Sequence, residues 1–138
     1  MRREMEQFID FIVDLADEEL YSFFDGNARA FFLHGGCFEF AKIIKSNIKH
    51  SKIIINKEEN HCGVLYRGKL YDANGLIKDK NNFRLASTQD IKFMEDNFGI
   101  PEKRYINGIR IVDFLNNELK FCNIEDMLKK LDDVEQER

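Results

Sequence analysis

The feature that most constrains the fold is a glycine pair that leads directly into a cysteine and an apolar run, within residues 33–44. Gly35 and Gly36 allow a tight backbone turn that residues with side chains resist. From Cys37 onward, apolar residues recur at helical spacing on the face that carries the cysteine; they are Phe40, Ala41, Ile44 and Ile48. A thiol at a helix N-terminus lies at the positive end of the helix dipole, which favours its anionic form. The segment therefore predicts a central, largely buried helix over residues 37–47, with a nucleophilic cysteine at its start.

Length and composition indicate one globular domain over residues 1–138, with a core packed by Phe, Ile and Leu. Hydrophobic residues make up 43% of the chain and charged residues 33%, an ordinary globular mixture. The net charge of −4 argues against a dedicated surface for nucleic acid or for an anionic membrane. No stretch approaches the ~20 apolar residues that a membrane span needs. Three cysteines without a secretory signal favour a reducing cytoplasm, either bacterial or that of a phage host.

Periodicity predicts helices towards both ends of the chain and short strands between them. The expected helices lie within residues 4–24, 91–98 and 109–119, with a last one after Asn123. The expected strands lie at residues 52–56, 61–66, 69–75 and 83–85. This order favours an α+β fold in which the cysteine-bearing helix packs on a small antiparallel sheet, with extra helices at both termini.

Two of these strands form a predicted hairpin, and its register decides which side chains meet. With a two-residue turn at residues 67–68, His61 faces Asn74 on the partner strand. Because side chains alternate along a strand, His61 then shares a face with Asp72 and Asn74. A three-residue turn would shift the register and send Asp72 to the opposite face.

Cys37, His61 and either Asp72 or Asn74 supply, in that order, the groups that a thiol nucleophile needs. An imidazole takes the thiol proton, and an acceptor on the next strand fixes the tautomer of the imidazole. The thiolate would attack an amide or ester carbonyl, and water or an amine would release the resulting thioester. The backbone N–H of Cys37 is a natural oxyanion donor. The upstream polar candidates for a second donor or other support are Asn27 and His34.

The run Gly-Gly-Cys-Phe-Glu-Phe-Ala, a histidine on a strand, and Leu-Tyr-Asp-Ala-Asn-Gly on its partner resemble the papain-like cysteine hydrolases. The resemblance covers residues 30–76 and is closest to the transglutaminase-like branch. It implies a papain-like core with Cys37 as nucleophile, His61 as base and Asp72 as orienter, and no metal or organic cofactor. It also implies hydrolysis or acyl transfer at an amide, isopeptide or thioester bond of a peptide, protein or small acyl substrate. One departure is Phe31, which stands where papain-type peptidases carry a glutamine oxyanion donor.

Other interpretations of the same residues stay open. Cys37 alone would be a small buried hydrophobe, and residues 72–75 could simply end a strand in a turn. A zinc site that added Cys62 to the three residues above is disfavoured, because adjacent strand residues point to opposite faces and no Cys-x-x-Cys pair exists. The small size and Phe31 favour a different class, a non-catalytic binding or inhibitory protein of phage or mobile-element origin on the same fold. A third option is an acyltransferase that resembles arylamine acetyltransferases.

Overall fold

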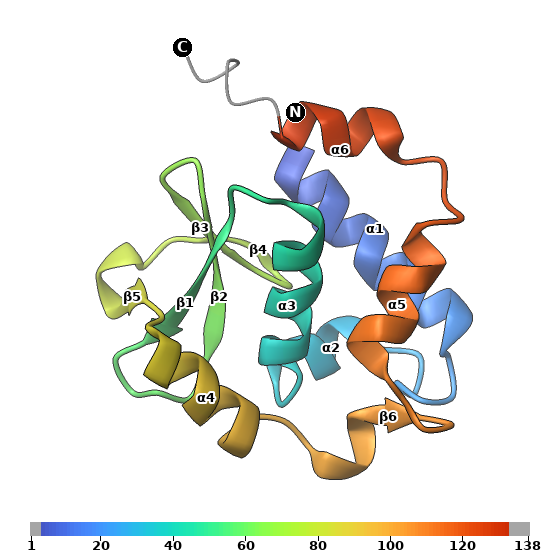
Figure 1. Cartoon of the computed structure of the whole chain (residues 1–138), viewed down its shortest axis with the longest axis horizontal. Helices are drawn as coiled ribbons and strands as arrows, with labels where there is room; N and C mark the ends of the chain where they lie inside the picture. The colour runs from blue at the N-terminus through green and yellow to red at the C-terminus, as the bar shows by residue number, and fades with distance from the viewer. Residues whose placement is uncertain (1–3, 133–138) are drawn as a thin grey trace.

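The structure, a computed structural model, describes residues 4–132 of the chain (Figure 1). Its helices are α1 (Glu4–Glu19), α2 (Ala28–Leu33), α3 (Cys37–Asn47), α4 (Thr88–Asn97), α5 (Ile111–Leu119) and α6 (Glu125–Asp132). Its strands are β1 (Lys52–Asn56), β2 (Cys62–Tyr66), β3 (Lys69–Asp72), β4 (Gly75–Ile77), β5 (Phe83–Leu85), β6 (Tyr105–Ile106) and β7 (Ile109–Arg110). Single 3-10 turns at η1 (Lys80–Asn82) and η2 (Pro101–Lys103) complete the secondary structure.

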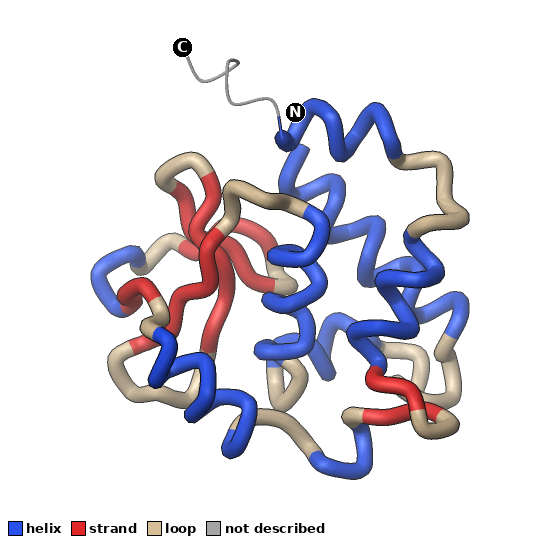
Figure 2. The backbone as a smooth tube through the Cα atoms, viewed as in Figure 1, coloured by secondary structure: helices blue, strands red, loops and turns tan. Residues whose placement is uncertain are grey.

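Five strands form one antiparallel sheet in the order β4-β3-β2-β1-β5, and β6 and β7 form a separate ribbon. Helix α3 packs against β1, β2 and β3. Helices α2 and α5 contact α3, and α1 contacts α2, α6 and β4. Figure 2 shows the sheet on one side of α3 and most of the helical segments on the other. The fold is therefore α+β, with the cysteine-bearing helix between the sheet and the remaining helices.

Helix α3 can occupy the centre because it is apolar around most of its circumference. Its buried residues are Cys37, Phe38, Glu39, Phe40, Ala41, Ile43 and Ile44. Phe32 of α2 packs on Phe40 with ring centroids 4.9 Å apart. The backbone enters the helix through Gly35 at a φ of 127° and Gly36, where a Cβ would overlap the ring of Phe31. The expectation of a buried helix over residues 37–47, preceded by a turn that only glycines permit, is confirmed.

The β2–β3 hairpin has the predicted two-residue turn. Arg67 and Gly68 both have positive φ angles, 49° and 75°, as the mirror-image turns of tight hairpins require. The register pairs Tyr66 with Lys69, as that turn length dictates. Consequently Asp72, at the end of β3, falls on the side of the hairpin that carries His61.

Three elements differ from the sequence-based expectations. Helix α2 is an additional short helix of six residues, and the side chain of Asn27 caps its start. The strand expected over residues 69–75 ends at Asp72, so Asn74 lies in the turn at residues 73–74 rather than on a strand opposite His61. Strand β4 follows this turn and adds an edge to the sheet. The predicted helix over residues 109–119 begins instead at Ile111, because Ile109–Arg110 pairs with β6 across an Asn-Gly turn. That dipeptide is a strong hairpin signal in its own right.

The outer helices form where the sequence predicts them. Helix α1 buries one face, made of Met5, Phe8, Ile9, Ile12, Val13, Leu15 and Ala16. Ser87 caps α4, and the Ser87 and Asp90 side chains form a reciprocal capping box. Across residues 4–132, no helix combines the length and the apolar character needed to cross a membrane.

Candidate active site

Cys37 is the first residue of α3, and the turn through Gly36 delivers its thiol to the tip of the helix. The residue is only 6% exposed, yet it lines a cavity of about 290 Å³ that opens to the surface. The N–H groups of the first helical turn have no acceptor within the helix. The thiol therefore borders a small cavity that is open to the surface. It also lies beside backbone N–H groups without an acceptor in the helix and at the positive end of the helix dipole.

His61 and Asp72 meet across the hairpin. The Nε2 atom of His61 lies 3.0 Å from Oδ2 of Asp72. The other carboxylate oxygen, Oδ1, accepts a 2.9 Å hydrogen bond from the backbone N–H of Asn74, which holds the carboxylate in place. Because the carboxylate engages Nε2, Nδ1 is the ring nitrogen left to interact with Cys37. His61, Asp72 and Asn74 line a second cavity of about 720 Å³.

The electrostatics favour the charged forms of both the thiol and the imidazole. A hydrogen bond to Asp72, and then one to Cys37, raises the pKa of His61 from its ordinary 6.5 to about 9. The Cys62 thiol hydrogen bond is the main cause that lowers the pKa of Cys37 from 9.0 to about 5, with His61 adding to it and burial opposing it. Between these two pKa values, the thiolate form of Cys37 and the imidazolium form of His61 are favoured together.

Cys62 is a site residue that the sequence interpretation considered for a function only as part of a disfavoured zinc site. It is the first residue of β2, it is buried, and its side chain faces Cys37. Burial and the neighbouring Cys37 raise the pKa of Cys62 well above 9.0, so it stays a thiol and donates to the thiolate. Its position next to His61, near the start of the predicted strand, was the available signal.

Two polar side chains hold the backbone on either side of the His61–Asp72 pair. Asn56, buried at the end of β1, accepts hydrogen bonds at Oδ1 from the backbone N–H groups of Asn60 (2.9 Å) and His61 (3.0 Å). Arg29 of α2 donates from Nη1 to the carbonyl of Ala73 at 2.6 Å. Its Nη2 pairs with Asp10 of α1 at 3.0 Å. The loop before His61 and the turn after Asp72 are thereby tied to the body of the fold.

The two upstream polar candidates lie in different places. His34 ends α2 and lines the cavity that contains His61. Asn27 lies outside both cavities that border the cysteine and the histidine. Its side chain accepts a 3.0 Å hydrogen bond from the N–H of Ala30, and it lines a different hollow together with Phe23. The structure thus gathers Cys37, His61, Asp72 and Asn74, with His34 at the rim, and leaves Asn27 apart.

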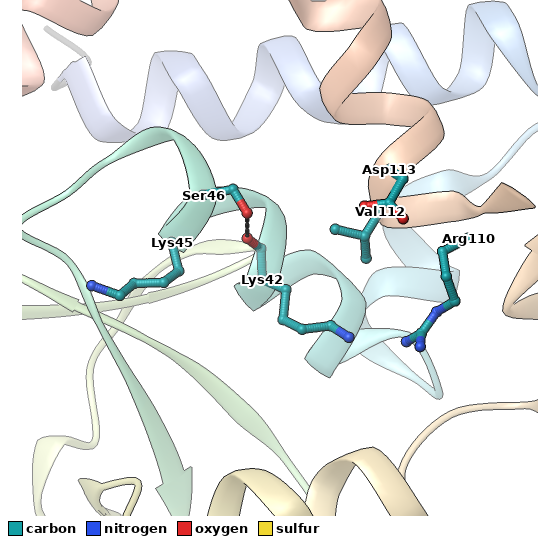
Figure 3. A pocket seen from close by; sticks show the side chains of 6 residues that line it. All are labelled: Lys42, Lys45, Ser46, Arg110, Val112 and Asp113. Carbon is teal, nitrogen blue, oxygen red and sulfur yellow. Dashed lines mark hydrogen bonds between the residues drawn. The ribbon is translucent and has the colours of Figure 1, made fainter. Parts of the chain in front are cut away.

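A further hollow, of about 430 Å³, lies between α3 and the start of α5 (Figure 3). Its lining residues are Lys42, Lys45, Ser46, Arg110, Val112 and Asp113. Lys42 and Arg110 extend toward the same space, but both are already paired with carboxylates. Lys42 pairs with Glu95 at 3.0 Å, and Arg110 pairs with Glu39 at 3.0 Å and Glu95 at 3.2 Å. This hollow is therefore the surface of an ion network that joins elements of the fold.

Within the part of the chain that the structure describes, no group of three or more His, Cys, Asp or Glu side chains is arranged to hold a metal ion. Searches against curated proteins and against solved structures return no significant match. A family model described as Phage YunG-like protein matches residues 8–120, a span that includes every residue of the candidate site. Because that match covers far more than half of the chain, this protein belongs to the phage YunG-like family.

Proposed function

We propose that this chain is a cysteine-dependent hydrolase or acyltransferase, built on a core like that of the transglutaminase-like branch of the papain-like hydrolases. The observation that carries the proposal is the 3.0 Å contact between His61 and Asp72, on an imidazole that interacts with Cys37, at the tip of α3, closely enough to lower the pKa of that thiol. A cysteine at the start of a helix, a histidine directly before β2 and an aspartate at the end of β3 follow one another in the order that the resemblance implies. The bond attacked would be an amide, an isopeptide or a thioester. All three cysteines are free thiols, which is compatible with a reducing cytoplasm.

In the first half-reaction, the Cys37 thiolate attacks the carbonyl carbon and forms a carbon–sulfur bond. The carbonyl oxygen takes up the negative charge, which the N–H groups at the start of α3 stabilise. The His61 imidazolium then gives its proton to the leaving nitrogen or sulfur as the bond to that atom breaks. The products are a thioester on Cys37, a neutral His61 and a free amine or thiol.

In the second half-reaction, neutral His61 takes a proton from water or from an acceptor amine as that molecule attacks the thioester. The carbon–sulfur bond breaks, and the sulfur leaves as the thiolate beside the reformed imidazolium. Asp72 stays ionised throughout, since its role is to orient the ring and to stabilise its positive charge.

Asn60 is our candidate for the second oxyanion donor, in place of the glutamine that Phe31 replaces. It lines both cavities and precedes His61 directly. Its Oδ1 accepts a 2.6 Å hydrogen bond from Nδ2 of Asn56, so its own Nδ2 is the end left to donate to a substrate. Loss of one such donor typically slows acyl transfer by about 10²–10³-fold.

Alkylation by iodoacetamide, followed by intact-protein mass, tests the proposal. In the wild type, Cys37 should be alkylated with a rate that rises as the pH passes about 5, where the thiolate forms. In His61→Ala that rise should move to alkaline pH, and Cys37→Ala should lose both the label and any turnover of an acyl thioester. Cys122→Ala, which alters a thiol outside the site, is the control and should behave like the wild type. If wild-type Cys37 is labelled slowly, with the pH profile of an ordinary thiol that His61→Ala does not change, the proposed enzymatic function is refuted.

The second candidate is a non-catalytic binding or inhibitory protein on the same fold. Two observations favour it: Phe31 packs over Gly36 where papain-type peptidases place a catalytic glutamine, and the matching family is described as phage-associated. In that case Cys37→Ala would keep full partner binding and biological effect.

A further inference from the structure

Two cavities border the candidate site, and each is lined by different residues of that site. The smaller, of about 290 Å³, is lined by Cys37, Phe93 and Phe98, with Glu59 and Asn97 among its polar lining residues. The larger, of about 720 Å³, is lined by His61, Asp72 and other polar residues. Gly35 and Asn60 line both, so the two hollows adjoin at the site. The nucleophile belongs to the lining of one, and the proton donor to the lining of the other.

The proposed reaction assigns a substrate part to each cavity. After attack, the acyl group stays bonded to the Cys37 sulfur, so it must occupy space that the sulfur borders. The leaving group must receive a proton from His61, so it must occupy space that the imidazole borders. The acyl group therefore belongs in the smaller cavity and the leaving group in the larger.

The smaller cavity has an aromatic wall. Phe93 of α4 and Phe98, just beyond its end, lie edge to face with ring centroids 6.0 Å apart and planes at 72°. Phe93 is 38% exposed, a large apolar surface that a substrate could cover. Pockets for drug-sized ligands have volumes of about 300–1,000 Å³. This cavity lies at the lower end of that range, so its size suits one large apolar side chain rather than a larger ligand.

The wall is held against the nucleophile's own loop. A Cβ at Gly99 would come 3.4 Å from the carbonyl oxygen of Gly35. A Cβ at Gly35 would in turn come 3.1 Å from Cδ1 of Ile100. This close packing ties the end of α4 to the turn that delivers Cys37, so the aromatic wall keeps a defined place beside the sulfur.

We infer that the site takes acyl groups with an aromatic or similarly large apolar side chain, bound against the wall that Phe93 and Phe98 form, and releases a polar leaving group on the His61 side. This inference rests on the proposed function and adds the substrate class. The leaving group is assigned as polar because His34, Asn60 and Asn74 line the larger cavity, in which it would lie.

The test compares two acyl thioesters of the same thiol, one with an acetyl and one with a 3-phenylpropionyl group. The rate of Cys37 acylation is followed by intact-protein mass, and each rate is divided by that of the same thioester with N-acetylcysteine. The wild type should prefer the phenylpropionyl group by about tenfold or more, a typical discrimination for a pocket filled by apolar groups. Phe93→Ala should lower that preference at least severalfold, and Phe98→Leu should lower it as a second, milder change.

Phe121→Ala is the matched control, because Phe121 is 82% exposed and lines neither cavity; its preference should equal that of the wild type. Equal normalised rates for the two thioesters in the wild type, with iodoacetamide still labelling Cys37 below pH 7, would overturn this inference and leave the proposed function standing. A Cys37 that neither thioester acylates and iodoacetamide does not label below pH 7 would overturn both.

Discussion

At Cys37, the two side chains that stabilise the thiolate are neighbours in the sequence. Consecutive residues within a strand point to opposite faces, so His61 and Cys62 would not normally reach one sulfur. They do so here because β2 begins at Cys62, while His61 belongs to the preceding loop, where Asn56 holds its backbone. The boundary between loop and strand thus brings an imidazole and a thiol to the same helix tip.

The contribution of Cys62 can be measured directly. Cys62→Ala removes the hydrogen bond that lowers the pKa of Cys37 the most, while burial continues to raise it. The pH at which iodoacetamide labelling of Cys37 reaches half its plateau should therefore move upward from about 5, toward the 9.0 of an ordinary thiol. Cys122→Ala is the control, and its labelling profile should superimpose on that of the wild type. An unchanged profile in Cys62→Ala would leave His61 and the helix as the stabilising groups.

At the scale of elements, the hairpin carries the histidine and the aspartate, but α2 fixes where β3 ends. Arg29 reaches from α2 to the carbonyl of Ala73 and is itself held by Asp10 of α1. The short helix that the sequence interpretation missed therefore has a positioning role, because it anchors the turn that presents Asp72.

Arg29→Lys tests that role while keeping the positive charge. Lysine cannot reproduce the two-pronged contact of a guanidinium, so the turn after Asp72 should loosen. Since the Asp72 hydrogen bond is the main cause of the raised pKa of His61, the alkaline limb of the turnover profile should move down from about 9 toward 6.5. Unfolding by urea should show a loss of about 1 kcal/mol. Arg67→Lys, which alters an arginine bonded to a carbonyl of α6, is the control and should leave the pH profile in place.

At the scale of the whole molecule, a network of charges joins α3 to the C-terminal third of the chain. Glu39, a buried residue of α3, pairs with Arg110, the last residue of β7. Glu95 of α4 pairs with Lys42, Arg104 and Arg110. Through these contacts, the helix that carries Cys37 is tied to α4, whose Phe93 lines the smaller cavity.

Glu39→Ala should therefore destabilise the whole fold. It leaves Arg110 with one carboxylate partner and opens a gap beside α3, which should cost about 2–3 kcal/mol in the free energy of unfolding. Urea denaturation measures this loss as a lower midpoint with an unchanged slope. Glu102→Ala, at an exposed glutamate, should unfold like the wild type. A Glu39→Ala midpoint equal to that of the wild type would mean that the network adds no net stability.

Local sequence patterns determined the start of the central helix and the geometry of the hairpin that carries Asp72. Glycines before an apolar run dictate the turn into α3, and a two-residue turn dictates that Asp72 lies on the side of His61, because side chains alternate along a strand. Short elements such as α2 and β4 carry too little periodicity to be recognised, since their stability comes from packing rather than from their own residues.

Only the tertiary structure decided which residues meet across long stretches of chain. The sequence alone does not mark Cys62 as a donor to Cys37, and it takes that place because α3 packs on β2. Likewise, Phe93 looks like an ordinary residue of an amphipathic helix, and only the close packing of Gly99 on Gly35 shows that this helix ends beside Cys37. Periodicity reports which face of an element is buried, but the partner of that face depends on packing between distant segments, which no local pattern encodes.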